Sequence, residues 1–106
     1  MIFRGAIYEV KPAKDATGHE HKGKRYGVVI QSDAFASSTV TLALTSTSAH
    51  HTIYRPAIEF LGAKSRVLTD QIYSVDHGRL GDFMGALDFD EIEVLNRALL
   101  LKLGLS

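Results

Sequence analysis

Apolar and polar residues alternate with a period of two through much of the first two thirds of the chain. The clearest runs are residues 6–10 (AIYEV) and 40–45 (VTLALT), which are also rich in β-branched side chains. This period is typical of strands that bury one face. Shorter candidates, separated by Gly, Ser, Thr or Pro, are residues 27–32, 57–60, 67–69 and 72–75. The pattern predicts an all-β body of five or more strands.

The last stretch changes to helical spacing, with apolar residues at Ile92, Leu95, Leu99 and Leu103. Asp88 can cap the start of this helix, with Glu91 three residues on, and Gly104 suits its end. The sequence therefore predicts a mainly β fold, a small barrel followed by one C-terminal amphipathic helix.

Length and composition describe a single folded unit. The 106 residues are about one domain, with 45% hydrophobic and 23% charged residues and no internal repeat or linker. We therefore expect one domain over residues 1–106. The chain contains no cysteine, which excludes disulfides, thiol nucleophiles and cysteine zinc sites. It also has no membrane-length apolar run and no signal-like start, so we expect a soluble, cytoplasmic protein with no membrane partner.

Charge is balanced overall but uneven along the chain, with 12 basic against 12 acidic residues. Residues 1–25 carry six basic and three acidic residues, whereas residues 67–106 carry three basic and seven acidic residues. The protein could present a basic face to a polyanion if the fold keeps these segments apart. A solvated surface on which positive and negative side chains are evenly distributed explains the charges about as well.

Residues 25–45 have the pattern of an antiparallel hairpin centred on Phe35. Partners that sum to 70 would place Val28 opposite Leu42 and Ile30 opposite Val40, with apolar residues on one face. In this register Arg25 lies directly across from Thr45 on the other face. The hairpin therefore predicts that these two side chains can reach a common ligand.

The segment before Arg25 is similar to a phosphate-binding P-loop but does not match it. Residues 18–25 read GHEHKGKR, where an arginine replaces the magnesium-binding hydroxyl and a strand follows instead of a helix. We therefore reject nucleotide binding. His19 and His21 could chelate a metal with His50 or His51, but no helical histidine motif supports this, and solvated loop histidines are the favoured interpretation.

A third interpretation treats these residues as a basic loop that leads into Arg25, whose guanidinium suits phosphate oxygens. Lys22 and Lys24 would add charge, and Ser46 and Thr47 would add hydroxyls beside Thr45. From spacing alone, a plain polar turn explains the hydroxyl residues better.

The motifs closely resemble those of the MazF/PemK toxin endoribonucleases. The opening pattern Gly18-x-Glu20-x-x-Gly23-x-Arg25 runs into the strand VVIQSD at residues 28–33. The resemblance continues over essentially the whole chain, in LTS at residues 44–46, VLTDQI at 67–72, RLG at 79–81 and LGL at 103–105. Two positions depart from the family pattern: His21 replaces a usual glutamine, and Tyr26 replaces a usual proline.

The resemblance implies an SH3-like barrel with a terminal helix, a homodimer, and cleavage of single-stranded RNA at defined sequences without a metal or other cofactor. Attack by the ribose 2′-hydroxyl would give 2′,3′-cyclic phosphate and 5′-hydroxyl ends. Arg25 would stabilise the pentacoordinate phosphate and Thr45 would hydrogen-bond one of its oxygens. Glu20 and His21 are the acid and base candidates. A cognate antitoxin would block the RNA site.

Two other functions remain open at this point. One is a non-enzymatic toxin similar to CcdB, which binds DNA gyrase; a loop that ends in a phosphate-ready arginine argues against it. The other is an RNA-binding barrel without turnover.

Overall fold

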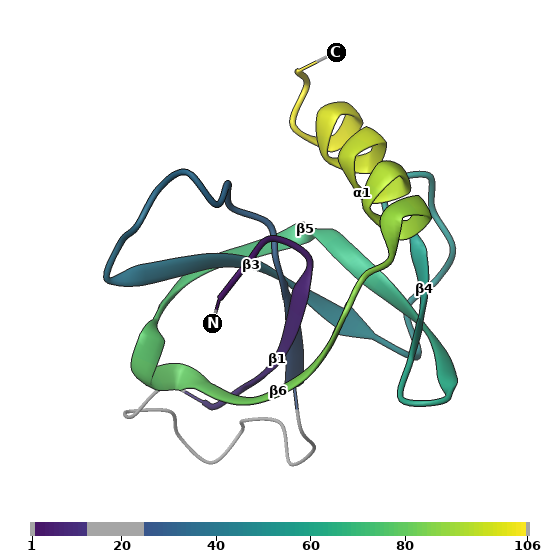
Figure 1. Ribbon diagram of the computed structural model, residues 1–106. Coiled ribbons are helices and arrows are strands. Elements are labelled where there is room, and N and C mark those ends of the chain that lie inside the picture. The colour runs from purple at the N-terminus through teal and green to yellow at the C-terminus, as the bar shows by residue number, and fades with distance from the viewer. Residues whose placement is uncertain (1, 13–24, 106) are drawn as a thin grey trace.

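The computed structural model describes residues 2–12 and 25–105. These residues form a mainly β domain in which six strands are followed by one long helix (Figure 1). The elements in chain order are β1 (Ala6–Val10), β2 (Arg25–Val29), β3 (Thr39–Ser46), β4 (Ala57–Phe60), β5 (Ala63–Asp76), the 3-10 turn η1 (His77–Arg79), β6 (Leu80–Ala86) and α1 (Phe89–Lys102).

The strands form one antiparallel sheet in the order β4-β5-β3-β2-β1-β6, which curls into a nearly closed barrel. In Figure 1 the strands surround the N-terminal segment, while α1 lies beside β4 and points away from the barrel. The predicted small β-barrel with a C-terminal helix is confirmed. No helix among the described residues is long and apolar enough to cross a membrane.

β5 links the two halves of the sheet. Its 14 residues pair with β4 at one end and with β3 along the rest, and its register with β3 shifts between Ala43 and Thr45. The two candidate segments 67–69 and 72–75 are thus parts of one strand. β6 was not among the predicted strands, because its sequence LGDFMGA contains two glycines and lacks clear alternation.

Apolar side chains are buried on both faces of the sheet. One cluster, which includes Val28, Ala43 and Val67, packs against Leu95 and Leu99 of α1. On the other face, the barrel interior is filled by residues that include Val10, Leu42, Leu44, Leu68 and Val75. The helix is therefore the cover for one face, as its apolar stripe predicts.

The ends of α1 follow the predicted capping chemistry. Asp88 accepts a hydrogen bond from the Glu91 backbone N–H at 2.8 Å, and the Glu91 carboxylate accepts one from the Asp88 N–H at 3.0 Å. Gly104 follows the helix with φ +70°. The second Glu91 oxygen accepts the backbone N–H of Glu59 in β4 at 3.0 Å, so the cap also ties the helix to an edge strand.

The β2–β3 register differs from the predicted one by a single residue. The observed partners are Gly27 with Leu44, Val28 with Ala43 and Val29 with Leu42, which sum to 71 and not to 70. The expected pairs Val28–Leu42 and Ile30–Val40 are therefore wrong. Hydrophobic pattern could not fix this register, because neighbouring residues of both strands are buried on opposite faces.

Candidate functional site

Arg25 is the first residue of β2, opposite Val10 of β1. The residue is half-buried at the end of the barrel. Its guanidinium makes no hydrogen bond or ion pair in the described structure. No described residue therefore occupies its donors, which suit an anionic oxygen.

The one-residue shift in register changes the residue that lies across from Arg25, from the predicted Thr45 to Ser46. Continuing the observed register two residues beyond the Gly27–Leu44 pair places Thr45 across from Tyr26 and Ser46 across from Arg25. The Thr45 hydroxyl accordingly lies 3.5 Å from the Tyr26 carbonyl oxygen, to which it donates. The predicted directly opposite pair of Arg25 and Thr45 is therefore wrong: Ser46 shares the face of Arg25, whereas the Thr45 side chain projects from the opposite face of the sheet.

Ser46 begins a short polar turn. Its hydroxyl accepts the Ser48 backbone N–H at 3.2 Å and lies 3.3 Å from the Ser48 hydroxyl, while Thr47 is exposed. These contacts are those of a serine turn, which was the plainer of the two interpretations of this segment. The turn nevertheless leaves hydroxyl groups at the same end of the sheet as Arg25.

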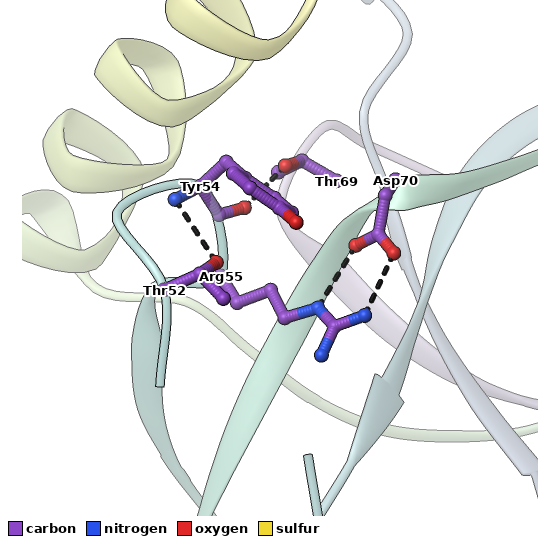
Figure 2. Close-up of polar contacts among 5 residues, drawn as sticks. All are labelled: Thr52, Tyr54, Arg55, Thr69 and Asp70. Carbon is purple, nitrogen blue, oxygen red and sulfur yellow. Dashed lines mark hydrogen bonds and ion pairs between the residues drawn. The ribbon is translucent and has the colours of Figure 1, made fainter. Parts of the chain in front are cut away.

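The loop that follows, residues 47–56, is anchored to β5 by polar contacts (Figure 2). Arg55 donates two hydrogen bonds to the carboxylate of Asp70, from Nε at 3.0 Å and from Nη2 at 2.8 Å. The Thr69 hydroxyl donates to the Tyr54 carbonyl oxygen, and the Tyr54 N–H donates to the Thr52 hydroxyl at 3.3 Å. We call the contacts of Tyr54 and Arg55 with Thr69 and Asp70 the loop brace.

The Arg55–Asp70 pair sets the ionisation of both groups. Hydrogen bonding to Arg55 lowers the pKa of the Asp70 carboxyl, against a smaller opposing effect of burial. The same hydrogen bonds raise the pKa of the Arg55 guanidinium. Both side chains are therefore charged at neutral pH, and their charges offset each other.

Arg66 of β5 lies on the other side of Ser46, because Ser46 pairs with Arg66 and Thr45 pairs with Val67. Its Nη1 donates to the Arg55 carbonyl oxygen at 2.9 Å. Sequence analysis assigned no functional role to Arg55 or Arg66, and Asp70 stood out only as part of the motif VLTDQI at residues 67–72. They lie on different segments and no local motif joins them, so only the register of β3 with β5 brings them to this end.

The remaining predicted residues of the site, Glu20, His21, Lys22 and Lys24, lie outside the described residues. They stay predictions, as does the alternative metal site that used His19. Residues 2–12 and 25–105 contain no group of three or more side chains that could hold a metal ion. His50 and His51 are exposed in the β3–β4 loop.

The chain is similar to several known proteins over nearly its full length. A sequence profile of PemK-like, MazF-like toxins of type II toxin-antitoxin systems matches residues 3–103. A protein of Mycobacterium tuberculosis (strain ATCC 25618 / H37Rv), the candidate toxin Rv3098A, is 40% identical over 106 residues, which are 99% of this chain and 100% of that protein.

Solved structures with the same fold have lower identity. An endoribonuclease in complex with its cognate antitoxin from a mycobacterial species aligns with a TM-score of 0.82 at 20% identity, covering 100% of this chain and 98% of that chain. The Mycobacterium tuberculosis toxin MazF-mt6 aligns with a TM-score of 0.79 at 16% identity, covering 95% and 98%. The profile match over almost the whole chain and the relative at 40% identity show that this protein belongs to the PemK-like, MazF-like toxin family of type II toxin-antitoxin systems.

Proposed function

We propose that this protein is an endoribonuclease toxin that cuts single-stranded RNA at defined sequences without a metal ion. Its family membership supports this proposal, as does the endoribonuclease among the solved structures that share its fold. The observation on the chain itself that carries the proposal is the guanidinium of Arg25, which has no polar partner among the described residues and lies beside Ser46 at the end of β3. Such a group can bind a phosphodiester and stabilise negative charge that develops on it.

In the proposed reaction, the ribose 2′-oxygen attacks the adjacent phosphorus and loses its proton to a base. The bond from phosphorus to the 5′-oxygen breaks, and an acid protonates that oxygen. The products carry a 2′,3′-cyclic phosphate and a 5′-hydroxyl, so no water is consumed and no cofactor is required. The protein must orient the attack, move two protons and stabilise the pentacoordinate phosphate.

Arg25 stabilises the extra negative charge on the phosphate. The register does not support the expected hydrogen bond from Thr45 to a phosphate oxygen, because the Thr45 side chain projects from the face opposite to Arg25 and its hydroxyl donates to the Tyr26 carbonyl oxygen at 3.5 Å. Ser46, Thr47, Lys22 and Lys24 bind the RNA backbone. Arginine side chains stay protonated near neutral pH, so the proton transfers are assigned to Glu20 and His21.

The decisive experiment is to incubate the purified protein with a long RNA in excess EDTA and to identify the ends of the products. Cleavage with cyclic phosphate and 5′-hydroxyl ends supports the proposal. Loss of all activity in EDTA contradicts the metal-independent mechanism. Retarded RNA without cuts supports an RNA-binding barrel without turnover, and absence of both cutting and binding favours a gyrase-binding toxin similar to CcdB.

Three further properties belong to the same proposal. A cognate antitoxin neutralises the protein by covering its RNA site, which is consistent with the antitoxin complex of a structural relative. The functional unit is a homodimer, because a two-fold interface can create a groove longer than one small barrel offers. The protein acts in the cytoplasm, where its RNA substrates are.

A further inference from the structure

The corrected register places a second arginine in line with Arg25. Val10, Arg25, Ser46 and Arg66 follow one another across β1, β2, β3 and β5, where Val10–Arg25 and Ser46–Arg66 are ladder pairs and Arg25–Ser46 continues the β2–β3 register. Residues directly opposite each other in antiparallel strands project from the same face. Arg25 and Arg66 therefore flank Ser46 on one face of the sheet. We call these three residues the row.

Arg66 is oriented by the loop brace. Its Nη1 donates to the Arg55 carbonyl oxygen at 2.9 Å, and the Arg55 side chain is fixed in turn by two hydrogen bonds to Asp70. In Figure 2 Arg55 extends from the loop across β5 to reach Asp70. Arg66 is thus held by a carbonyl oxygen, which occupies one donor and leaves the positive charge unneutralised.

Neighbouring charges reinforce this arrangement. Asp70 is the carboxylate that the structure places in this brace, and its charge is offset by Arg55. No side chain of the described residues makes a salt bridge with Arg25 or Arg66. The row therefore carries two guanidinium groups whose charge is available to an external anion.

The two guanidinium groups do not converge on one point. Adjacent strands are about 4.8 Å apart, so the backbones at Arg25 and Arg66 are separated by roughly 10 Å. Arg55 lies in the chain leading into β4, on the far side of β5 from β3, so the hydrogen bond to its carbonyl oxygen draws the Arg66 guanidinium away from Arg25. Two separate anionic groups fit this geometry better than a single one does.

We propose that Arg66 binds a second backbone phosphate of the RNA, adjacent to the phosphate held by Arg25. This inference rests on the proposed endoribonuclease function and extends its substrate site. The contact recognises the charge of the backbone and not the identity of a base, so it contributes affinity equally for every RNA sequence.

The test compares Arg66→Gln with wild type in binding to a single-stranded RNA that carries a 2′-deoxynucleotide at the cut position. This RNA lacks the attacking hydroxyl, so binding is measured without cleavage. We expect Arg66→Gln to weaken binding roughly tenfold at low salt, because a hydrogen bond to a charged group is lost. We also expect the slope of log affinity against log salt to become shallower by about 0.7, the value for one phosphate contact on a single strand.

Arg97→Gln on α1 is the matched control, because it removes the same charge from an exposed arginine outside the row. Arg66→Lys keeps the charge and should keep the wild-type slope. If Arg66→Gln does not fold, Arg66→Met takes its place, since it retains the aliphatic part of the side chain. In cleavage of normal RNA, the neutral variants should raise KM and leave kcat and the cut sequences unchanged.

Several outcomes would overturn the proposal. An unchanged salt slope in the neutral Arg66 variants rules out a phosphate contact, as does an equal loss in Arg97→Gln. If Arg66→Lys loses as much as Arg66→Gln, the effect arises from the bond to the loop and not from the charge. If only the binding of an acidic peptide is weakened, the row serves a protein partner. Failure of wild type to cut RNA contradicts the proposed function itself and is seen before any variant is made.

Discussion

At the scale of single residues, Arg25 is distinguished by what it does not contact. Arg55 is committed to Asp70 and Arg66 to a backbone carbonyl oxygen, whereas the Arg25 side chain has no polar partner among the described residues. A ligand can therefore engage Arg25 without breaking an interaction with any described residue. Its half-buried position also keeps the charge where water screens it less than on an open surface.

Replacing Arg25 should remove most of the activity. We expect Arg25→Ala to lower the cleavage rate by roughly two or more powers of ten, the range for deletion of one donor that stabilises transition-state charge. Arg25→Lys should recover little, because an ammonium group does not reproduce the planar fork of donors. Single-turnover cleavage of a labelled RNA measures both, and an alanine variant that cuts at the wild-type rate would show that the assignment is wrong.

His21 offers a separate test of the acid and base assignment. If it transfers a proton, the rate should follow a titration near the unperturbed histidine value of about 6.5, and His21→Gln should abolish both the inflection and most of the activity. If it only positions RNA, as the usual glutamine of the family would, His21→Gln should keep the rate and its pH profile. A pH–rate series on wild type and His21→Gln decides between the two roles.

At the scale of elements, Glu91 connects the start of α1 to the sheet. One carboxylate oxygen closes the capping box with Asp88, and the other accepts the backbone N–H of Glu59 on the edge strand β4. A single side chain thereby satisfies two backbone donors on different elements.

Loss of the Glu91 side chain should therefore lower the free energy of unfolding at least as much as loss of an ordinary helix cap does. We expect Asp88→Ala to lower the free energy of unfolding by about 1 kcal/mol. Glu91→Ala should lower it by a similar or larger amount, because it also leaves the Glu59 N–H without its partner. Urea unfolding measures these changes, with Glu93→Ala on the exposed side of the helix as the control. A Glu91 effect no larger than that of Glu93 would contradict the linking role.

The loop brace should make stability depend on pH in a predictable direction. Arg55 lowers the pKa of Asp70 in the folded protein, so this carboxylate contributes stability above its unfolded value of about 3.9. That contribution is lost as the pH falls through the lowered pKa of the folded state. We expect Asp70→Asn to be less stable than wild type at neutral pH and the difference to shrink below about pH 4.

Denaturant unfolding of both proteins across this pH range measures the difference. Asp82→Asn on β6 is a suitable control, because its exposed carboxyl takes no part in the brace. A difference between Asp70→Asn and wild type that does not change with pH would contradict the contribution of the ion pair.

At the scale of the whole molecule, the exposed surface of α1 supports assembly. Val94 and Leu101 lie away from the apolar stripe of the helix and are exposed, together with Phe89 and Leu100 on α1 and with Leu103 and Leu105 directly after it. An exposed group of large apolar residues on one element is typical of an interaction surface.

We expect the purified protein to be a homodimer at micromolar concentration. Light scattering should give a mass of about twice that of the chain, whereas a mass near 11.6 kDa would count decisively against the dimer. Val94→Glu and Leu101→Glu test whether α1 contributes to the interface. If it does, these variants should shift the mass toward the monomer, while Glu93→Lys on the same helix serves as a control of similar exposure.

Local chemistry in the sequence was sufficient to predict most of the elements. The alternation in residues 6–10 and 57–60 located β1 and β4, and Asp88, Glu91 and Gly104 located the ends of α1, because capping depends on residues within one turn. The motifs around Arg25 and Thr45 also led to the right family. β6 could not be located in this way, since its glycine-rich segment becomes a strand through pairing with β1.

The arrangement of the site was decided by the tertiary structure. Val28 and Val29 are both buried, on opposite faces, so their pattern is satisfied by either of two registers and does not choose between them. Contacts with β1, β5 and α1 select the observed one, which places Ser46 across from Arg25 and Thr45 beside the Tyr26 carbonyl oxygen. Arg66 and the Arg55–Asp70 pair join the site only through strand pairing over long sequence separations. The sequence by itself determined the strands other than β6, the helix and its caps, which depend on neighbouring residues, whereas only the tertiary structure decided which side chains meet.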